Sequence, residues 1–300
     1  MSIETRLREI LDADQILKNE PMSRHTTFRT GGPAEYLVTP GRAQIAELLH
    51  LLRSEKIPFT VIGNGSNLLV GDGGIDGVVI EIGSRMAAIT CSGHEIDAEA
   101  GALMSKVAAA ALEAGLSGFE CEAGIPGSIG GAVVMNAGAY GGEMKDVLIS
   151  ADILTPDGTA ITLDASELEL SYRHSCVPEK GYLVLSARIG LLPGDPEQIR
   201  ARMDELKEKR VSKQPLEYPS AGSTFKRPEG LFAGKLIEDA GLKGFSVGDA
   251  QVSVKHSGFV INTGQATSAQ IRSLMKQVQE KVMEQFGVML EPEVRMIGKF

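Results

Sequence analysis

The chain has few cysteines, and the three present suit neither a disulfide nor a zinc site. Cys91, Cys121 and Cys176 are odd in number, and no two stand at C-x-x-C spacing. This usage is typical of reduced thiols in a cytosolic protein rather than of a secreted disulfide scaffold. The histidines include no pair at ligand spacing and no H-E-x-x-H motif, so we expect no metal.

An excess of basic residues and a long apolar run are also missing. Lys and Arg total 30 against 39 Asp and Glu, which gives a formal net charge of −9. Such a chain is a poor candidate for binding nucleic acid or an anionic membrane. The longest uncharged run, residues 123–142, holds seven glycines and a proline, unlike a transmembrane helix. The charged N-terminal stretch shows no signal peptide, so we expect a cytoplasmic protein without membrane insertion.

Two common nucleotide-binding signatures are absent. No G-x-x-x-x-G-K-[ST] occurs, which excludes a P-loop. The turn at Gly63–Asn67 fails the dinucleotide pattern G-x-G-x-x-G, because Leu68 stands three residues after Gly65.

The length and periodicity predict a soluble α+β protein of two domains. The chain has 300 residues, 43% of them hydrophobic and 23% charged, as in ordinary globular proteins. The turn at 193–196 is the clearest linker, so we expect domains at 1–195, with an internal break near 83, and at 196–300. The expected helices are 3–18, 42–54, 104–113, 197–212, 232–240 and 268–286. The expected strands are 36–40, 59–63, 78–83, 86–91, 94–99, 147–155, 159–163, 182–191, 251–254, 258–262 and 293–297.

Glycine is the residue in excess, with 35 of 300 residues, roughly 12% against a usual ~7%. One cluster is Gly63, Asn64, Gly65, Ser66 and Asn67, between two apolar segments. Glycines allow close backbone approach, and consecutive N–H groups form an anion-binding concavity. The cluster is either a pyrophosphate cradle or an ordinary tight turn.

The second glycine cluster is longer and nearly uncharged. Its candidate ligand-binding residues are Gly124, Pro126, Gly127, Ser128, Gly130, Gly131, Asn136, Gly138 and Ala139. A helix opening at Ser128 would point its N–H groups at a phosphate. The alternative is a glycine-rich loop packed against its own backbone.

Five motifs in order along the chain resemble one family of flavoenzymes. They are GNGSNLLV, AGIPGSIGGAVVMNAGAYGGE, SYRHS, SAGSTFKRP and LEPEVRMIG, and the resemblance runs from about Thr26 to Gly298. Together they resemble the UDP-N-acetylenolpyruvoylglucosamine reductases, which complete UDP-N-acetylmuramate in bacterial peptidoglycan synthesis. The short stretch between Arg173 and Lys213 resembles the subfamily without a long tyrosine-bearing loop. At Gly258 the family pattern leads us to expect Asn, so no substrate contact is assigned there.

The resemblance implies cofactors, a fold and a reaction. It implies non-covalent FAD, NADPH as hydride donor, and a two-part FAD domain of the vanillyl-alcohol-oxidase type followed by a C-terminal α+β substrate domain. The expected substrate is the enolpyruvyl ether of UDP-N-acetylglucosamine, with a monomer favoured.

The same resemblance assigns three catalytic residues. Ser223 would protonate the substrate α-carbon, and Arg173 would pair with the carboxylate, as a guanidinium does bidentately. Glu293 lies between apolar residues, where burial would raise its pKa and let it donate a hydrogen bond to the developing charge. Without the family pattern, Ser223 is interpreted as a turn serine bonded to its own backbone, Arg173 as a surface ion-pair residue and Glu293 as an exposed strand carboxylate.

Four further residues are expected to contact the UDP-sugar: Tyr172, Lys213, Lys226 and Arg227. The three basic ones suit a diphosphate, or else are solvated surface charges. Ser223 and Lys226 also form S-x-x-K, the signature of penicillin-binding enzymes, but S-D-N and K-T-G are missing. The residues also leave open a flavin-dependent carbohydrate oxidase and a non-enzymatic flavin-binding protein.

Overall fold

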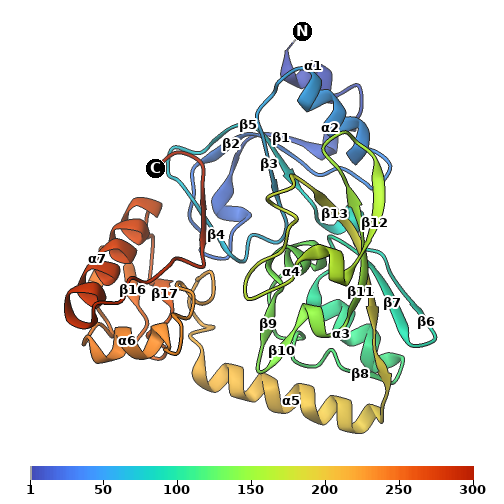
Figure 1. The fold of residues 1–300 in the computed structure, drawn as a ribbon. Coiled ribbons are helices and arrows are strands. Elements are labelled where there is room, and N and C mark those ends of the chain that lie inside the picture. Colours follow the sequence, from blue (N-terminus) through green and yellow to red (C-terminus); the bar gives the residue numbers. More distant parts are fainter. Residues whose placement is uncertain (1) are drawn as a thin grey trace. The chain divides into compact units, whose positions relative to one another are not determined.

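Helices and strands of the computed structural model, which describes residues 2–300, are mixed along the chain (Figure 1). The α-helices are α1 (Ile3–Leu7), α2 (Ile45–Ser54), α3 (Met104–Glu113), α4 (Ile129–Met135), α5 (Pro196–Lys213), α6 (Ala233–Asp239) and α7 (Ser268–Phe286). The strands before α4 are β1 (Ile16–Pro21), β2 (Pro33–Val38), β3 (Phe59–Ile62), β4 (Leu68–Val70), β5 (Ile75–Glu81), β6 (Ile89–Ser92), β7 (Glu95–Glu99) and β8 (Leu116–Ser117). Those after it are β9 (Gly138–Ala139), β10 (Gly142–Glu143), β11 (Leu148–Leu154), β12 (Ala160–Asp164), β13 (Leu183–Gly190), β14 (Leu192–Pro193), β15 (Ser246–Val247), β16 (Ala250–Val252), β17 (Val260–Asn262) and β18 (Arg295–Ile297).

The chain divides into two compact units, each assembled from separate segments. Unit 1 contains the residues up to Leu17, Leu37–Asn64 and Val78–Arg210. Unit 2 contains Lys18–Tyr36, Gly65–Gly77 and Val211–Phe300. The last crossing thus falls inside α5, whereas the sequence predicted one boundary at 195. The predicted break near 83 lies between β5 and β6.

Unit 1 is built around an antiparallel sheet of order β12-β11-β13-β7-β6. The strands β11 and β13 are mostly buried, as expected for central strands packed on both sides. Helix α4 contacts β13 and β7, and α3 contacts β6, β7 and β8, as Figure 1 shows. A Pro-Asp-Gly turn at 156–158 joins β11 to β12, where Thr159 N donates to Thr155 Oγ1 at 3.1 Å.

A second sheet, of order β1-β2-β5-β3, includes a parallel pair in which Phe59 faces Val78. The sequence predicted an N-terminal helix over 3–18. In the structure the helix ends at Leu7, and the end of the predicted range belongs to β1, the first strand of this sheet. Gln15 turns the chain after the helix, since its side chain accepts from Asp12 N at 2.8 Å and donates to Thr39 O at 3.0 Å. The apolar residues around Ile10 therefore pack outside a helix, and β1 begins at Ile16.

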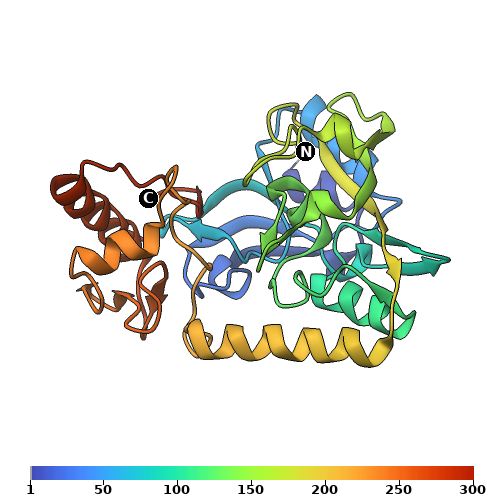
Figure 2. The same cartoon turned by 60° about the horizontal axis from the view of Figure 1, so that its bottom comes forward.

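Unit 2 holds an antiparallel sheet of order β15-β16-β17 and the parallel pair of β4 with β18. Helix α7 contacts all three strands of the sheet, and α6 lies beside α7 (Figure 2). The inner face of α7 is buried at Ile271, Leu274, Met275, Val278 and Val282. Burying these side chains at helical spacing gives the unit its core.

None of the helices in residues 2–300 is long and apolar enough to span a bilayer.

Candidate active site

Within unit 1 the two glycine-rich clusters meet. The side-chain amide of Asn64 donates to the carbonyl of Pro126 at 2.7 Å. A Cβ at position 63 would lie 2.6 Å from Ser128 Oγ, so a larger residue at Gly63 would force the Ser128 hydroxyl to move. The sequence predicted both clusters at one cofactor, and the structure brings Gly63 and Asn64 against the loop that leads into α4.

The start of α4 differs in part from the expected phosphate-binding helix end. Ser128 is the N-cap, as predicted. The N–H groups of Ile129 and Gly130, however, donate to Ala102 O at 2.9 Å and Ala100 O at 2.8 Å. These two amides are therefore already paired, because the loop packs against the strand end at 100–102. Gly131 is different: it is exposed, and a Cβ there would meet only Ser128 Oγ, at 3.9 Å.

The end of α4 turns through Asn136, a fully buried residue with φ 40°. Its side-chain amide donates to Glu143 Oε2 and to Ser171 O, both at 3.0 Å. Its Oδ1 accepts from Lys145 N at 2.9 Å. These three bonds hold the short hairpin of β9 and β10, which contains the predicted residues Gly138 and Ala139.

Arg173 is anchored to that hairpin. Its guanidinium donates to Gly138 O at 3.3 Å and lies over the Tyr172 ring, 5.0 Å from the centroid. Arg173 has φ 56°, a conformation uncommon for a residue with a side chain, and strain of this kind collects at functional sites. Arg173 and Tyr172 therefore lie together with the second glycine cluster.

Two residues near this cluster were not anticipated. The Arg210 guanidinium lies so close to Gly124 that a Cβ there would sit 3.0 Å from it, and burial lowers the pKa of Arg210. Glu122 is buried, with no hydrogen-bond partner for Oε2 in the described residues, and burial raises its pKa to about 7. A buried carboxyl directly before a glycine-rich motif has no sequence signal of its own.

The rest of the first glycine cluster, Gly65, Ser66 and Asn67, belongs to unit 2. Gly65 has φ 61°, and a Cβ there would overlap His25 O at 1.9 Å, so glycine is required. The side-chain amide of Asn67 donates to the carbonyl of Glu293 at 3.1 Å, and Asn67 O accepts from Arg295 N at 2.9 Å. Asn67, a predicted cofactor residue, is thus linked to Glu293, a predicted catalytic residue, next to the point where β4 pairs with β18.

Ser223 and Glu293 are brought together by a residue between them, Thr224, which is 1% exposed. Thr224 O accepts from Glu293 N at 2.9 Å, while Thr224 Oγ1 accepts from Val260 N at 2.9 Å. Ser223 itself is exposed, and its hydroxyl has no hydrogen-bond partner among residues 2–300. The interpretation of Ser223 as a turn serine bonded to its own backbone is therefore not observed.

The predicted diphosphate-binding residues of unit 2, Lys213, Lys226 and Arg227, each have different surroundings. Lys226 is paired with Glu291 at 2.5 Å. Arg227 is exposed and its guanidinium stacks 5.3 Å from the Phe232 centroid. Lys213 is exposed at the end of α5.

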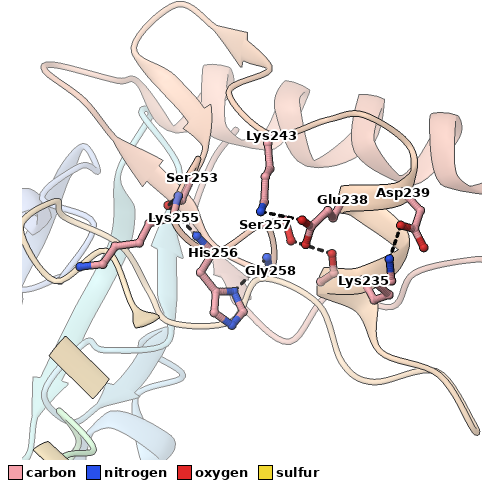
Figure 3. Close-up of polar contacts among 10 residues, drawn as sticks. Lys235, Glu238, Asp239, Lys243, Ser253, Lys255, His256, Ser257 and Gly258 are labelled. Carbon is pink, nitrogen blue, oxygen red and sulfur yellow. Dashed lines mark hydrogen bonds and ion pairs between the residues drawn. The ribbon is translucent and has the colours of Figure 1, made fainter. Parts of the chain in front are cut away.

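The structure explains the departure at Gly258. A Cβ on Gly258 would lie 3.0 Å from the ring of His256, so the asparagine expected there would force this ring to shift. His256 instead occupies that space, with its ring directed at the Gly258 amide (Figure 3).

The residues of unit 1 fit an FAD cofactor. Gly131 leaves open space at the N-terminal end of α4. The glycines on either side allow a flat ligand to approach the backbone. The residues that would hold it are Gly63 and Asn64 together with the segment from Gly124 to Ala139. Among the described residues no group of three or more His, Cys, Asp or Glu side chains is placed to hold a metal.

Comparison with known proteins agrees with this arrangement. Residues 34–164 match the family model of an FAD binding domain, and residues 214–297 match that of the UDP-N-acetylenolpyruvoylglucosamine reductase C-terminal domain. A variant of Phl p 4, a glucose oxidase, has a TM-score of 0.51 at 14% identity, covering 65% of this chain and 45% of that one. That likeness shows the fold alone, and it confirms the expected fold of the vanillyl-alcohol-oxidase type.

Closer relatives cover the chain from end to end. UDP-N-acetylenolpyruvoylglucosamine reductase of Agathobacter rectalis is 60% identical over 95% of both chains, and that of Caldanaerobacter subterraneus is 52% identical over 98% of this chain and 97% of the relative. The crystal structure of the Thermus caldophilus enzyme has a TM-score of 0.81 at 36% identity, covering 94% of this chain and 97% of that one. The chain therefore belongs to the UDP-N-acetylenolpyruvoylglucosamine reductase family.

Proposed function

We propose that this chain reduces the enolpyruvyl ether of UDP-N-acetylglucosamine to UDP-N-acetylmuramate in the cytoplasm, with non-covalent FAD and with NADPH as hydride donor. Family membership supports the reaction, and the glycine-rich clusters of unit 1 support the cofactor. The observation that carries the catalytic assignment is the exposed Ser223 hydroxyl, fixed next to Glu293 through the buried Thr224. The three free cysteines suit a reducing compartment.

The chemistry divides between cofactor and protein. FAD, when bound, supplies the hydride for the enolpyruvyl β-carbon. Negative charge then develops at the α-carbon and its carboxylate, and the protein must stabilise this charge and deliver a proton. Ser223 donates that proton to the α-carbon, since even a weak acid protonates so strong a base. Arg173 pairs with the carboxylate, and Glu293 donates to or positions the same group.

The contacts of Lys226 argue against the S-x-x-K hydrolase. In that chemistry the lysine must lie beside the serine hydroxyl. Here Ser223 to Lys226 lies outside the helices and strands of the described chain, with a single bridge between Phe225 and Pro292, and no hydrogen bond joins the Lys226 and Ser223 side chains. The Lys226 ammonium is paired instead with Glu291.

An anaerobic titration tests the proposal. The purified protein should be yellow, with about one FAD per chain, released on denaturation. NADPH should bleach the flavin absorbance, and the enolpyruvyl substrate should then restore it. A protein that gains no flavin absorbance on adding FAD would overturn the proposal. Bleaching of the flavin by a free sugar and its restoration by oxygen, with no restoration by the enolpyruvyl substrate, would favour the carbohydrate oxidase.

A further inference from the structure

The turn from Ser253 to Phe259 in unit 2 is braced by its own side chains (Figure 3). Ser253 Oγ accepts from the backbone N–H groups of Lys255 at 3.1 Å and His256 at 3.2 Å. The hydroxyl of Ser257 donates to Gly234 O at 2.6 Å, which fastens the turn to α6. A turn held at both ends in this way presents its backbone carbonyls in fixed directions.

His256 closes the turn with its ring. Its Nδ1 accepts from Gly258 N at 3.1 Å, and its ring meets that of Phe259 edge-on, with centroids 4.9 Å apart. Because Nδ1 is an acceptor, the neutral imidazole must carry its proton on Nε2. Protonation of Nδ1 would break the bond to Gly258.

Burial of His256 favours its neutral form. Burial lowers the pKa of His256, a backbone hydrogen bond raises it in part, and the charges of Lys243 and Glu238 lower and raise it respectively. Lys243 and Glu238 are themselves paired at 2.7 Å, which offsets their opposite effects on the ring. Lys255, the other charged residue of the turn, directs its ammonium to Val211 O at 2.8 Å and to Glu217 at 3.5 Å.

The turn leads by one hydrogen bond to the predicted proton donor. Gly258 O accepts from Thr224 N at 2.9 Å, and Thr224 directly follows Ser223. His256, Gly258 and Thr224 therefore form a continuous path of hydrogen bonds that ends at the backbone of Ser223. Since Ser223 has an exposed side chain with no partner of its own in the described chain, its position depends on its backbone, which this path helps to fix together with the bonds of Thr224 to Glu293 N and Val260 N.

We propose that His256 is a positioning residue for Ser223, acting through the bond from Gly258 N to its Nδ1. The inference rests on the proposed function, in which Ser223 is the proton donor. His256 itself transfers no proton to substrate in this scheme. Its side chain sets the Gly258 carbonyl, and this carbonyl sets the Thr224 amide.

Asparagine and glutamine separate the two ring nitrogens. Asn places its amide oxygen near the position of Nδ1, whereas Gln reaches the position of Nε2. His256→Asn should therefore reoxidise with the enolpyruvyl substrate within threefold of the parent. His256→Gln should be roughly five- to tenfold slower, the usual effect of one lost hydrogen bond. Reduction of the flavin by NADPH and the substrate KM should be unchanged in both.

The pH profile of reoxidation and an NMR spectrum provide two further tests. Neither would change in the expected way if the role of His256 were purely structural. The parental reoxidation rate should fall in acid as His256 becomes protonated, and His256→Asn should lack this acid limb. Long-range ¹H–¹⁵N NMR of the parent should show one histidine locked as the Nε2–H tautomer, whose signals disappear in His256→Asn. A parental rate in His256→Gln, equal losses in both variants, or an Nδ1–H tautomer would each overturn the inference.

Ser223→Ala, measured in parallel, separates this inference from the proposed function. If Ser223→Ala reoxidises at the parental rate, the proton-donor assignment fails. If Ser223→Ala is slow while His256→Gln is at the parental rate, the positioning role alone fails. If both hold, His256→Gln should add no further loss to Ser223→Ala, because there is no longer a hydroxyl to position.

Discussion

Ser223 and Thr224 are neighbours with opposite surroundings. Thr224 is buried, and its backbone N–H, carbonyl and hydroxyl are all hydrogen-bonded, whereas the Ser223 hydroxyl is exposed and without a partner in the described chain. A polar group held in place but left unpaired is available to a ligand.

Ser223→Ala should therefore separate the two half-reactions. Flavin reduction by NADPH should stay within a few-fold of the parent, because the cofactor contacts are untouched. Anaerobic reoxidation by the enolpyruvyl substrate should slow by at least ~10²-fold, the low end for a general acid. Ser223→Cys should recover part of the rate, since a thiol of pKa near ~8.5 also gives up a proton. A parental reoxidation rate in Ser223→Ala would make Glu293 the leading candidate for the donor.

Arg173→Ala should also affect mainly the second half-reaction. Hydride transfer from NADPH creates no carboxylate charge for Arg173 to stabilise, whereas reduction of the substrate does. The expected loss in substrate-driven reoxidation is on the order of 10²–10³-fold, the usual size for one oxyanion-stabilising donor. Stopped-flow absorbance follows both steps. Equal losses in the two steps would assign Arg173 a structural role at the hairpin carbonyl of Gly138.

Glu122 should make stability fall as pH rises. Burial raises its pKa to about 7, so the folded protein keeps a proton that the unfolded chain releases near pH 4.5. The folded state then holds more protons between these values, and stability declines with pH in that window by on the order of 3 kcal/mol. Nearby Asp146 and Glu120 act in the same direction.

Glu122→Gln should remove this decline. Its unfolding midpoint in urea, relative to that of the parent, should rise from pH 4.5 to pH 7 and then level off. The exposed Glu113→Gln serves as the control and should follow the parent at every pH. A parental slope in Glu122→Gln would show that Glu122 ionises normally in the folded chain.

Among the elements, α4 is a short helix whose first turn contains Gly131, where the protein leaves room for a side chain. Gly131→Leu should abolish FAD binding while most of the fold remains, because the new side chain has room in the protein but fills the proposed cofactor space. Ala46→Leu, an exposed position on α2, is the matched control. Flavin fluorescence titration and far-UV circular dichroism measure the two properties. Normal FAD affinity in Gly131→Leu would mean that the cofactor lies elsewhere.

Helix α7 is fixed at both ends by local signals. Thr267 caps it, accepting from Gln270 N at 3.1 Å in a capping box, and Gly287 ends it with φ 68°. Thr267→Ala should lower the stability of the protein by about 1 kcal/mol, whereas Thr267→Ser should cost little. Urea denaturation followed by circular dichroism checks this, and equal stabilities of the Ala variant and the parent would contradict it.

Local signals also explain which elements the sequence predicts. The predicted helix over 268–286 matches α7 in full, because its cap, apolar spacing and terminal glycine agree. The helix predicted over 3–18 is wrong beyond Leu7, since the strand starting at Ile16 depends on pairing in a sheet. Strand β4 is missing from the predicted strands, because it has only three residues and directly follows the glycine-rich turn at Gly63–Asn67.

For the molecule as a whole, the family resemblance predicted the cofactor, fold type and reaction class. The residues themselves left each assignment open between a ligand contact and an ordinary structural role. What no pattern indicated is how the candidates are held: Thr224 between Ser223 and Glu293, and His256 behind Gly258. Each of these links has a backbone amide or carbonyl as at least one partner, and a backbone group has no signature in the sequence.

Because unit 2 is assembled from segments that are far apart in the sequence, its folding during synthesis is constrained in time. Its first segment, Lys18–Tyr36, leaves the ribosome well before Val211–Phe300 exists. At about 5–20 residues per second the wait is on the order of ten to thirty seconds. Strand β4 waits longer still for β18, which ends only three residues before Phe300. The apolar surface of these early segments therefore lacks its native partners until Val211–Phe300 has been synthesised, and exposed surface of this kind is prone to aggregation.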